Sequence, residues 1–331
     1  MRAAVIREPG TIEVTDVVDP TPGAGDVVVR VGACGICGTD LHIADGEFPP
    51  TPYPIVPGHE FAGEVVAVGA AVANARVGNR VAVDPSLFCG RCAECRRGRG
   101  NLCENWGATG DTVDGAFAEY VSVPAHTVYA LPDELGWAEA ALVEPVSCAV
   151  HGIQRLGVEV GDRVLVVGAG TMGLLIQQLA IRAGGVVSVV DRNTAKLPMA
   201  TELAAHATAA SVEELDAPPF DVAVDATGAP PAIEAAFDAL RRGGRLQIFG
   251  VAAAEARVNL SPFRIYNDEI TIVGSMAVLN SYGKALDLVA SGAVQVAPLV
   301  SATLPLSQFP EALQRVRDGA GFKVQIDPSA G

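Results

Sequence analysis

The chain has 331 residues, a length that favours two domains, since one domain spans roughly 100–200 residues. Half of the residues are hydrophobic and 18% are charged, which excludes a disordered chain. Asp and Glu number 38 against 23 Lys and Arg, so the formal net charge is −15. This charge excludes general electrostatic binding to nucleic acid or to an anionic membrane surface, and we expect neither as a partner.

The first residues, MRAAVIREPG, lack the apolar core of a secretory signal. The longest apolar stretch, 164–181, contains three glycines and two glutamines, so it predicts a buried strand, turn and helix and not a membrane span. Seven cysteines in a chain without an export signal indicate reduced thiols available for metal binding or catalysis. We therefore expect a cytoplasmic protein.

The first part of the chain predicts an irregular, strand-rich domain. Pro and Gly clusters separate short β-rich runs at 27–31, 64–68, 80–83 and 117–123. From Trp137 the pattern becomes helical, and Pro145 is expected to kink or restart that helix because proline lacks an N–H donor.

A second pattern begins near Gly161. Apolar strands alternate with helical segments, which indicates a parallel sheet covered on both faces, with strands at 164–167, 186–190, 222–225, 246–249 and 270–273. The end of the chain mixes elements again and is expected to rejoin the first domain. We predict domains over 1–150 and 151–280, and a returning C-terminal segment over 281–331.

Four cysteines lie close together, at Cys89, Cys92, Cys95 and Cys103. Four soft ligands on a tight loop suit tetrahedral Zn²⁺, whose closed four-cysteine sites hold irregular loops without redox chemistry. Neighbouring arginines are expected to help stabilise the thiolates. Free surface thiols and an iron–sulfur cluster are the alternatives. The spacing predicts a structural zinc lobe over about 86–106.

A second set of metal-binding side chains lies in two segments that flank a proline-rich loop. Cys37 supplies a thiolate, His59 an imidazole and Glu60 a carboxylate. A catalytic zinc takes three protein ligands and keeps a fourth position open, and this set can supply that arrangement. A lone histidine is more often a satisfied core or surface residue, so each short motif is weak alone.

The segment 163–173 has the form of a strand that enters a glycine turn and then a helix. The first glycine permits the tight turn, the second lets a pyrophosphate approach the backbone, and the third lets the helix pack on the strand. The helix N-terminus then faces the phosphates. We expect the dinucleotide to bind at Gly168, Gly170, Thr171, Met172 and Gly173.

Asp191 ends the next strand, where a carboxylate can accept hydrogen bonds from both adenine-ribose hydroxyls and repel a 2′-phosphate. NAD is therefore preferred over NADP. Arg192 leaves an alternative open, since its side chain could stack on adenine or pair with a 2′-phosphate. Thr227 and Val251 follow later strands, where a cofactor could also lie.

These motifs together resemble a known family. The run GHEFAGEVVAVG at 58–69, Cys37-Gly-Thr-Asp-x-His upstream, the four-cysteine lobe and the GxGxxG motif are similar to the zinc-dependent medium-chain dehydrogenase/reductase family over essentially the whole chain. Glu144-Pro145 resembles the polyol (sorbitol) and threonine dehydrogenase branch. The resemblance implies an α/β fold, with a GroES-like β-rich catalytic domain and a Rossmann doubly wound parallel-sheet cofactor domain, in a homodimer or homotetramer.

The resemblance also implies the ligands of a catalytic zinc. Cys37 and His59 would bind the metal, and Glu60 or Glu144 would complete the set directly or through water. With the four-cysteine lobe, this makes two zinc ions per chain, one catalytic and one structural.

The implied mechanism is Lewis-acid catalysis, in which zinc lowers the pKa of the substrate hydroxyl and a hydride passes to NAD. By resemblance, Thr39 would relay the proton with His42 as the next station, and Asp40 would orient His59. The alternative is that Thr39 and His42 only cap the following helical turn.

We therefore predict a zinc-dependent NAD(P) oxidoreductase that acts on CH–OH groups, with NAD as the cofactor and a small secondary alcohol, a polyol or sugar alcohol, as the substrate. The enzymatic alternatives are an L-threonine 3-dehydrogenase-like activity and a cyclitol or aminocyclitol dehydrogenase. A non-catalytic zinc and dinucleotide-binding protein is the remote alternative, since such a protein would have no reason to retain the second metal set.

Overall fold

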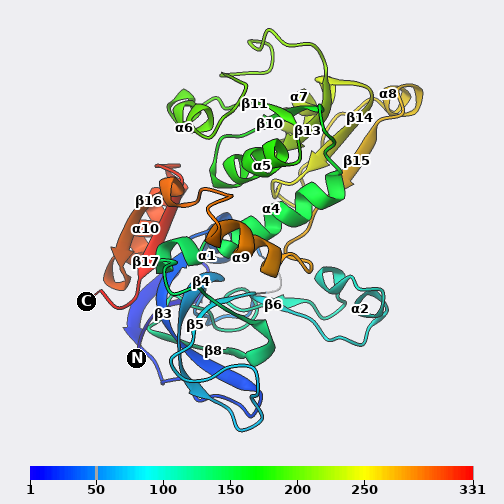
Figure 1. Cartoon of the computed structure of the whole chain (residues 1–331). Coiled ribbons are helices and arrows are strands. Elements are labelled where there is room, and N and C mark those ends of the chain that lie inside the picture. The colour runs from blue at the N-terminus through cyan, green and yellow to red at the C-terminus, as the bar shows by residue number, and fades with distance from the viewer. Residues whose placement is uncertain (49–50, 331) are drawn as a thin grey trace. The chain divides into compact units, whose positions relative to one another are not determined.

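The computed structural model describes residues 1–48 and 51–330 (Figure 1). Pro49, Pro50 and Gly331, which fall in the predicted first domain and C-terminal segment, lie outside the described residues. The first of two compact units consists of Met1–Ser147 together with the chain from Val278 onward, and the second consists of Cys148–Ala277. Among the described residues, no helix is long and apolar enough to cross a membrane.

A seven-stranded sheet forms the centre of the first unit. Its strands follow the order β16-β17-β3-β4-β5-β9, and β8 also pairs with β3. The bounds are β3 (Asp26–Gly35), β4 (Glu60–Val68), β5 (Arg80–Val83), β8 (Tyr120–Pro124), β9 (Val128–Ala130), β16 (Val300–Pro305) and β17 (Lys323–Asp327). β17 runs antiparallel to β3 and pairs Ile326 with Cys34. β17 therefore lies beside the end of β3.

Smaller elements complete the first unit. An N-terminal hairpin and a two-stranded ladder accompany the main sheet: β1 (Arg2–Glu8), β2 (Thr11–Asp16), β6 (Ser86–Leu87) and β7 (Gly107–Ala108). The short helices are α1 (Gly38–Asp45), α2 (Ala93–Arg96), α3 (Trp137–Ala140), α9 (Tyr282–Ala290) and α10 (Phe309–Arg317). Burial of apolar side chains from the sheet and from α10 stabilises this unit; the rings of Phe117 and Phe309 pack with centroids 4.7 Å apart.

The helical pattern after Trp137 is interrupted just ahead of Pro145. α3 ends at Ala140 and α4 (Val143–Leu156) begins three residues later. Pro145 thus lies in the first turn of α4, where a backbone N–H has no partner within the helix and its loss costs little. The proline is accommodated without a kink because the helix restarts before it.

The second unit contains the predicted parallel sheet. Its six strands follow the order β12-β11-β10-β13-β14-β15, which is the 3-2-1-4-5-6 order of a doubly wound fold. The bounds are β10 (Arg163–Val167), β11 (Val186–Val190), β12 (Ala207–Ala209), β13 (Phe220–Asp225), β14 (Leu240–Ile248) and β15 (Thr271–Gly274). The intervening helices are α5 (Thr171–Arg182), α6 (Leu197–Glu202), α7 (Pro230–Asp238) and α8 (Pro262–Asn267). The predicted fold class is confirmed.

The apolar runs explain this sheet. Val164, Leu165 and Val166 are fully buried, as expected for a central parallel strand that is covered on both faces. β10 pairs with β11 on one side and with β13 on the other. The chain reverses direction across the sheet between β10 and β13, and ligands bind at the carboxyl ends of strands near such a point.

Candidate metal centres and dinucleotide site

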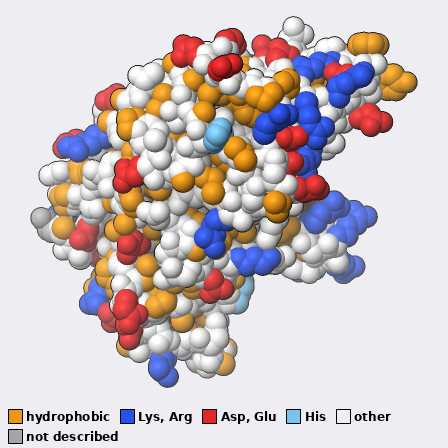
Figure 2. Space-filling view, turned by 45° about the horizontal axis from the view of Figure 1, so that its top comes forward, with side chains coloured by type: hydrophobic (Ala, Val, Ile, Leu, Met, Phe, Trp, Pro, Cys, Tyr) orange, Lys and Arg blue, Asp and Glu red, His pale blue; other side chains and the backbone are white. Residues whose placement is uncertain are grey.

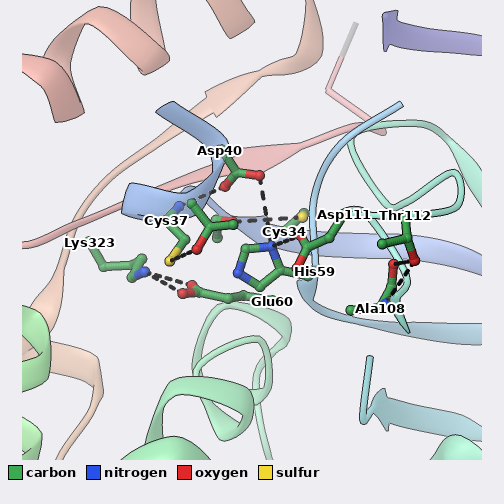
Figure 3. Close-up of polar contacts among 11 residues, drawn as sticks. Cys34, Cys37, Asp40, His59, Glu60, Ala108, Asp111, Thr112 and Lys323 are labelled. Atoms are coloured by element: carbon green, nitrogen blue, oxygen red, sulfur yellow. Dashed lines mark hydrogen bonds and ion pairs between the residues drawn. The ribbon is translucent and has the colours of Figure 1, made fainter. Parts of the chain in front are cut away.

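The second predicted metal set comes together in the first unit (Figure 3). Cys37 follows β3, and Glu60 begins β4 directly after His59. β3 and β4 are antiparallel and pair Gly35 with Glu60, so the end of one strand lies beside the start of the other. One ligand atom from each of Cys37, His59 and Glu60 lies within 4.8 Å of the others. A thiolate, an imidazole and a carboxylate at this spacing fit zinc.

His59 is buried, and its ring lies close to two carboxylates. Its Nδ1 lies 3.1 Å from Asp111 Oδ1 and 3.8 Å from Asp40 Oδ1 (Figure 3). Burial alone would lower the His59 pKa, but the Asp111 carboxylate outweighs it, with contributions from Cys37 and Asp40, and the pKa is raised well above its ordinary value. Such outer carboxylates fix the orientation of a metal-binding imidazole. We expected only Asp40 to orient His59; Asp111 is a second carboxylate beside the same ring nitrogen.

Asp40 is itself fully buried. Burial raises its pKa to about 7, although His59 and the backbone N–H of Cys37 favour the charged form. Asp40 Oδ2 accepts a hydrogen bond of 2.8 Å from that N–H. Asp40 therefore provides the acceptor for the Cys37 N–H at the start of α1. The alternative interpretation expected Thr39 and His42 to cap this helical turn.

Glu60 forms a buried ion pair with Lys323. The lysine Nζ lies 2.8 Å from Oε1 and 2.6 Å from Oε2 of Glu60, and it donates a third bond, of 3.0 Å, to the Ile36 carbonyl (Figure 3). Burial would lower the Lys323 pKa, but Glu60 and then Cys37 raise it. All three N–H donors of this ammonium are engaged. The lysine reaches the site because β17 pairs with β3.

The remaining predicted catalytic residues lie around this group. Thr39 Oγ1 is 3.8 Å from Cys37 Sγ. The partly exposed His42 places Nδ1 2.8 Å from Glu47 Oε2. Glu144 is buried in the first turn of α4 and contributes to the raised pKa of Lys323. The structure brings Glu60, and not Glu144, into the 4.8 Å group with the thiolate and imidazole.

The four-cysteine lobe also forms a compact group. The sulfurs of Cys89, Cys92, Cys95 and Cys103 lie within 4.8 Å of one another. Backbone N–H groups donate to these sulfurs, from Cys89 to Cys103 at 3.3 Å and from Cys92 to Cys89 at 3.4 Å. The N–H groups of Arg91 and Cys92 lower the Cys89 pKa to about 6, whereas desolvation raises that of Cys95 to about 12. Four sulfurs in this arrangement fit a closed zinc site.

Two arginines of the lobe pair with a neighbouring carboxylate. Arg97 and Arg99 pair with Glu94, at 2.8 and 2.7 Å. The main cause of the lowered Cys89 pKa is the backbone and not a guanidinium group. The basic side chains around α2, at the right of Figure 2, are all arginines.

The glycine turn lies in the second unit, between β10 and α5. Gly168 has φ +108°, in the region that favours glycine, and a Cβ there would lie 2.8 Å from Thr227 Cγ2. A Cβ at Gly173 would clash with the Gly168 carbonyl, so helix and turn pack closely. Apart from its chain neighbours, no described residue has an atom within 4 Å of a Cβ built at Gly170. This open space, beside the N-terminus of α5 that begins with Thr171 and Met172, fits an approaching pyrophosphate.

Asp191 follows β11 and joins this turn. Its Oδ2 accepts a 2.8 Å hydrogen bond from Ala169 N, and its Oδ1 accepts one of 2.8 Å from Asn193 N. Both carboxylate oxygens are thus held in place, with lone pairs left for a ribose. Arg192 and Val251 are exposed, and Thr227 and Val251 follow β13 and β14 at the carboxyl edge of the sheet.

Two family descriptions match the chain. Residues 23–133 match the alcohol dehydrogenase GroES-like domain, and residues 171–291 match the zinc-binding dehydrogenase domain. The chain is 37% identical to D-altritol 5-dehydrogenase of Agrobacterium fabrum, over 91% of this chain and 92% of the relative. It is 34% identical to D-arabinitol dehydrogenase 1 of Uromyces fabae (99% and 97% covered) and 34% identical to L-threonine 3-dehydrogenase of Saccharopolyspora erythraea (99% and 99%).

Solved structures agree over the whole chain. A chain from Sinorhizobium meliloti 1021 bound to NADP has a TM-score of 0.94 and 36% identity, with 99% of each chain covered. An Escherichia coli alcohol dehydrogenase complexed with NADH has a TM-score of 0.91 and 29% identity, again with 99% of each covered. The protein belongs to the zinc-dependent medium-chain dehydrogenase/reductase family. It is an oxidoreductase that acts on CH–OH groups.

Proposed function

We propose that this enzyme oxidises a secondary alcohol, a polyol or sugar alcohol, with NAD. The observation that carries the proposal is the convergence of Cys37, His59 and Glu60 within 4.8 Å. A bound zinc supplies Lewis acidity toward an alcohol oxygen, and a bound NAD accepts the hydride. Cys37 and His59 hold the metal, and Glu60 or Glu144 completes the set directly or through water.

In this proposal the surrounding residues orient the ligands and move the proton. Asp40 and Asp111 hold His59 from the Nδ1 side. The Thr39 hydroxyl, 3.8 Å from Cys37 Sγ, receives the proton of the alcohol and passes it toward His42. Since Glu47 holds His42 through Nδ1, the other ring nitrogen remains free to exchange the proton with water.

The hydrogen bonds that Lys323 already makes favour a polyol over threonine as the substrate. Binding of an amino acid requires a cation for its carboxylate near the metal, as well as a partner for its ammonium group. Lys323 lies beside the ligands, but its three donors are directed at Glu60 and Ile36. Neutral hydroxyls require no such cation. L-threonine, cyclitols and aminocyclitols remain the alternative substrates, and relatives named for polyols and for threonine lie at similar identity.

The test is a panel of NAD and NADP reduction assays. The substrates are sorbitol, xylitol, arabinitol, an altritol, butanediol, inositols and L-threonine. We expect turnover with NAD and at least one acyclic polyol. Turnover with L-threonine alone would contradict the substrate class, and a zinc-loaded protein that reduces neither cofactor with any alcohol would favour the non-catalytic alternative.

Asp191→Ala is expected to weaken NAD binding much more than NADP binding. The variant loses the acceptor for the ribose hydroxyls and removes the charge that repels a 2′-phosphate, so the Kd of NADH rises by about tenfold or more while that of NADPH changes little. Titration of both reduced cofactors, followed by fluorescence, measures the two Kd values. An equal effect on both would show that Asp191 does not distinguish them.

We also propose two zinc ions per chain and a homodimer or homotetramer. The described residues form two ligand groups, one of three side chains and one of four, and this supports two zinc ions per chain. For the assembly, β15 is an edge strand of its sheet, and Phe263 and Tyr266 on α8 are 72% and 82% exposed. Exposed apolar side chains and an edge strand both favour association with a second copy. Metal analysis and light scattering test these two points.

A further inference from the structure

Asp225, the last residue of β13, is a fully buried carboxylate outside the metal centres. A buried charge must be compensated by hydrogen bonds. Its Oδ1 accepts bonds from the Thr227 N–H at 2.9 Å and the Thr227 hydroxyl at 2.6 Å, and its Oδ2 accepts one from the Gly228 N–H at 3.0 Å. The carboxylate therefore holds the loop that follows its own strand.

The backbone of the same residue holds a second loop. The Asp225 carbonyl accepts hydrogen bonds from Phe249 N at 3.0 Å and from Gly250 N at 2.9 Å. These residues follow β14 and lead to Val251. A Cβ at Gly250 would clash with the Gly228 nitrogen, so the loops after β13 and β14 lie in direct contact.

The oriented Thr227 reaches a third loop. Its Oγ1, besides donating to Asp225, accepts a 3.0 Å bond from Ala229 N, which fixes the side-chain rotamer. Its Cγ2 then packs against Gly168, where an added Cβ would approach it to 2.8 Å. Asp225 thus connects the loops at the carboxyl ends of β10, β13 and β14.

We propose that Asp225 is a positioning residue for the nicotinamide half of the dinucleotide. The doubly wound sheet has two mononucleotide-binding halves, and β13 and β14 belong to the half opposite β11 and Asp191. Asp225 is wholly buried and acts through Thr227 and the 249–251 loop, not by contact. The inference rests on the proposed cofactor site in this unit.

Two variants test the inference. Thr227→Val keeps the shape of the side chain and loses the hydroxyl, and Asp225→Asn replaces one acceptor oxygen with an amide donor that faces N–H groups. We expect the Kd of NADH to rise by at least about fivefold in each, because Thr227→Val loses a hydrogen bond to the buried carboxylate and Asp225→Asn loses one of its acceptor oxygens. The Kd of AMP, which occupies only the adenine half, stays within about twofold of the wild-type value. Fluorescence titration and AMP competition measure these constants.

Matched variants separate positioning from general loss of structure. Thr227→Ser restores the hydroxyl and is expected to recover most of the NADH affinity lost in Thr227→Val. Asp191→Ala, in the adenine half, is expected to weaken both AMP and NADH. If Asp225→Asn does not fold, the threonine pair carries the same test.

Wild-type NADH affinity in Thr227→Val and Asp225→Asn would overturn the inference, as would an equal loss of AMP and NADH. A wild-type protein that binds neither nucleotide would overturn the proposed cofactor site and this inference with it. Selective loss of NADH with retained AMP binding supports the role of Asp225.

Discussion

Cys37→Ser is expected to abolish NAD reduction while the protein stays folded. Cys37 supplies the thiolate of the 4.8 Å group, and a serine hydroxyl is a far weaker ligand for zinc. Loss of Lewis-acid stabilisation worth several kcal/mol lowers kcat/KM by on the order of a thousandfold or more. Steady-state assays, metal analysis and circular dichroism on the same sample measure activity, zinc content and fold.

Zinc content distinguishes the two metal groups in this variant. The four-cysteine lobe does not include Cys37, so about one zinc per chain should remain. Cys148→Ser is the matched control, since Cys148 belongs to neither ligand group, and we expect it to keep activity and both metals. Full turnover in Cys37→Ser would refute the assignment of the catalytic metal.

In metal-free protein, Lys323→Met is expected to lower the free energy of unfolding by about 3–5 kcal/mol. The substitution keeps much of the side-chain volume but leaves the Glu60 carboxylate buried without its cation. A buried charge that loses its partner bears an uncompensated desolvation cost, which is larger than the net value of the pair. Urea unfolding followed by circular dichroism measures the difference.

Two further variants show whether burial is the cause. Glu60→Gln added to Lys323→Met removes the unpaired charge and should recover part of the lost stability. Arg315→Met disrupts the exposed pair of Arg315 with Glu311 on α10 and should change the stability by less than about 1 kcal/mol. Equal destabilisation by Lys323→Met and Arg315→Met would contradict the argument.

The second unit follows closely from the sequence because its strands are continuous apolar runs. The expected strand at 186–190 matches β11 (Val186–Val190), and the expected strand at 164–167 lies within β10. The sequence does not predict β12, whose three residues are only half-buried at the sheet edge, where the apolar pattern is weakest. Strand length and burial thus decide which elements the pattern reveals.

The candidate metal site is only partly predictable from sequence. Cys37, His59 and Glu60 lie in short motifs with recognisable ligand chemistry. Lys323 lies 263 residues from Glu60, and a single lysine near a chain end resembles a solvated surface residue. Asp111 has no spacing that links it to His59. Pairing of β17 with β3 and the loop after β7 bring these two residues to the site, and such tertiary contacts leave no local pattern.

The return of the chain to its first sheet sets an order of events during synthesis on the ribosome. The second unit is one continuous stretch, Cys148–Ala277, and can fold as soon as it has emerged. The first unit waits for β17, which follows the whole of the second unit in the chain, to complete its sheet and to supply Lys323 as the partner of Glu60. A nascent chain stalled before that strand therefore carries a complete second unit and an incomplete first unit.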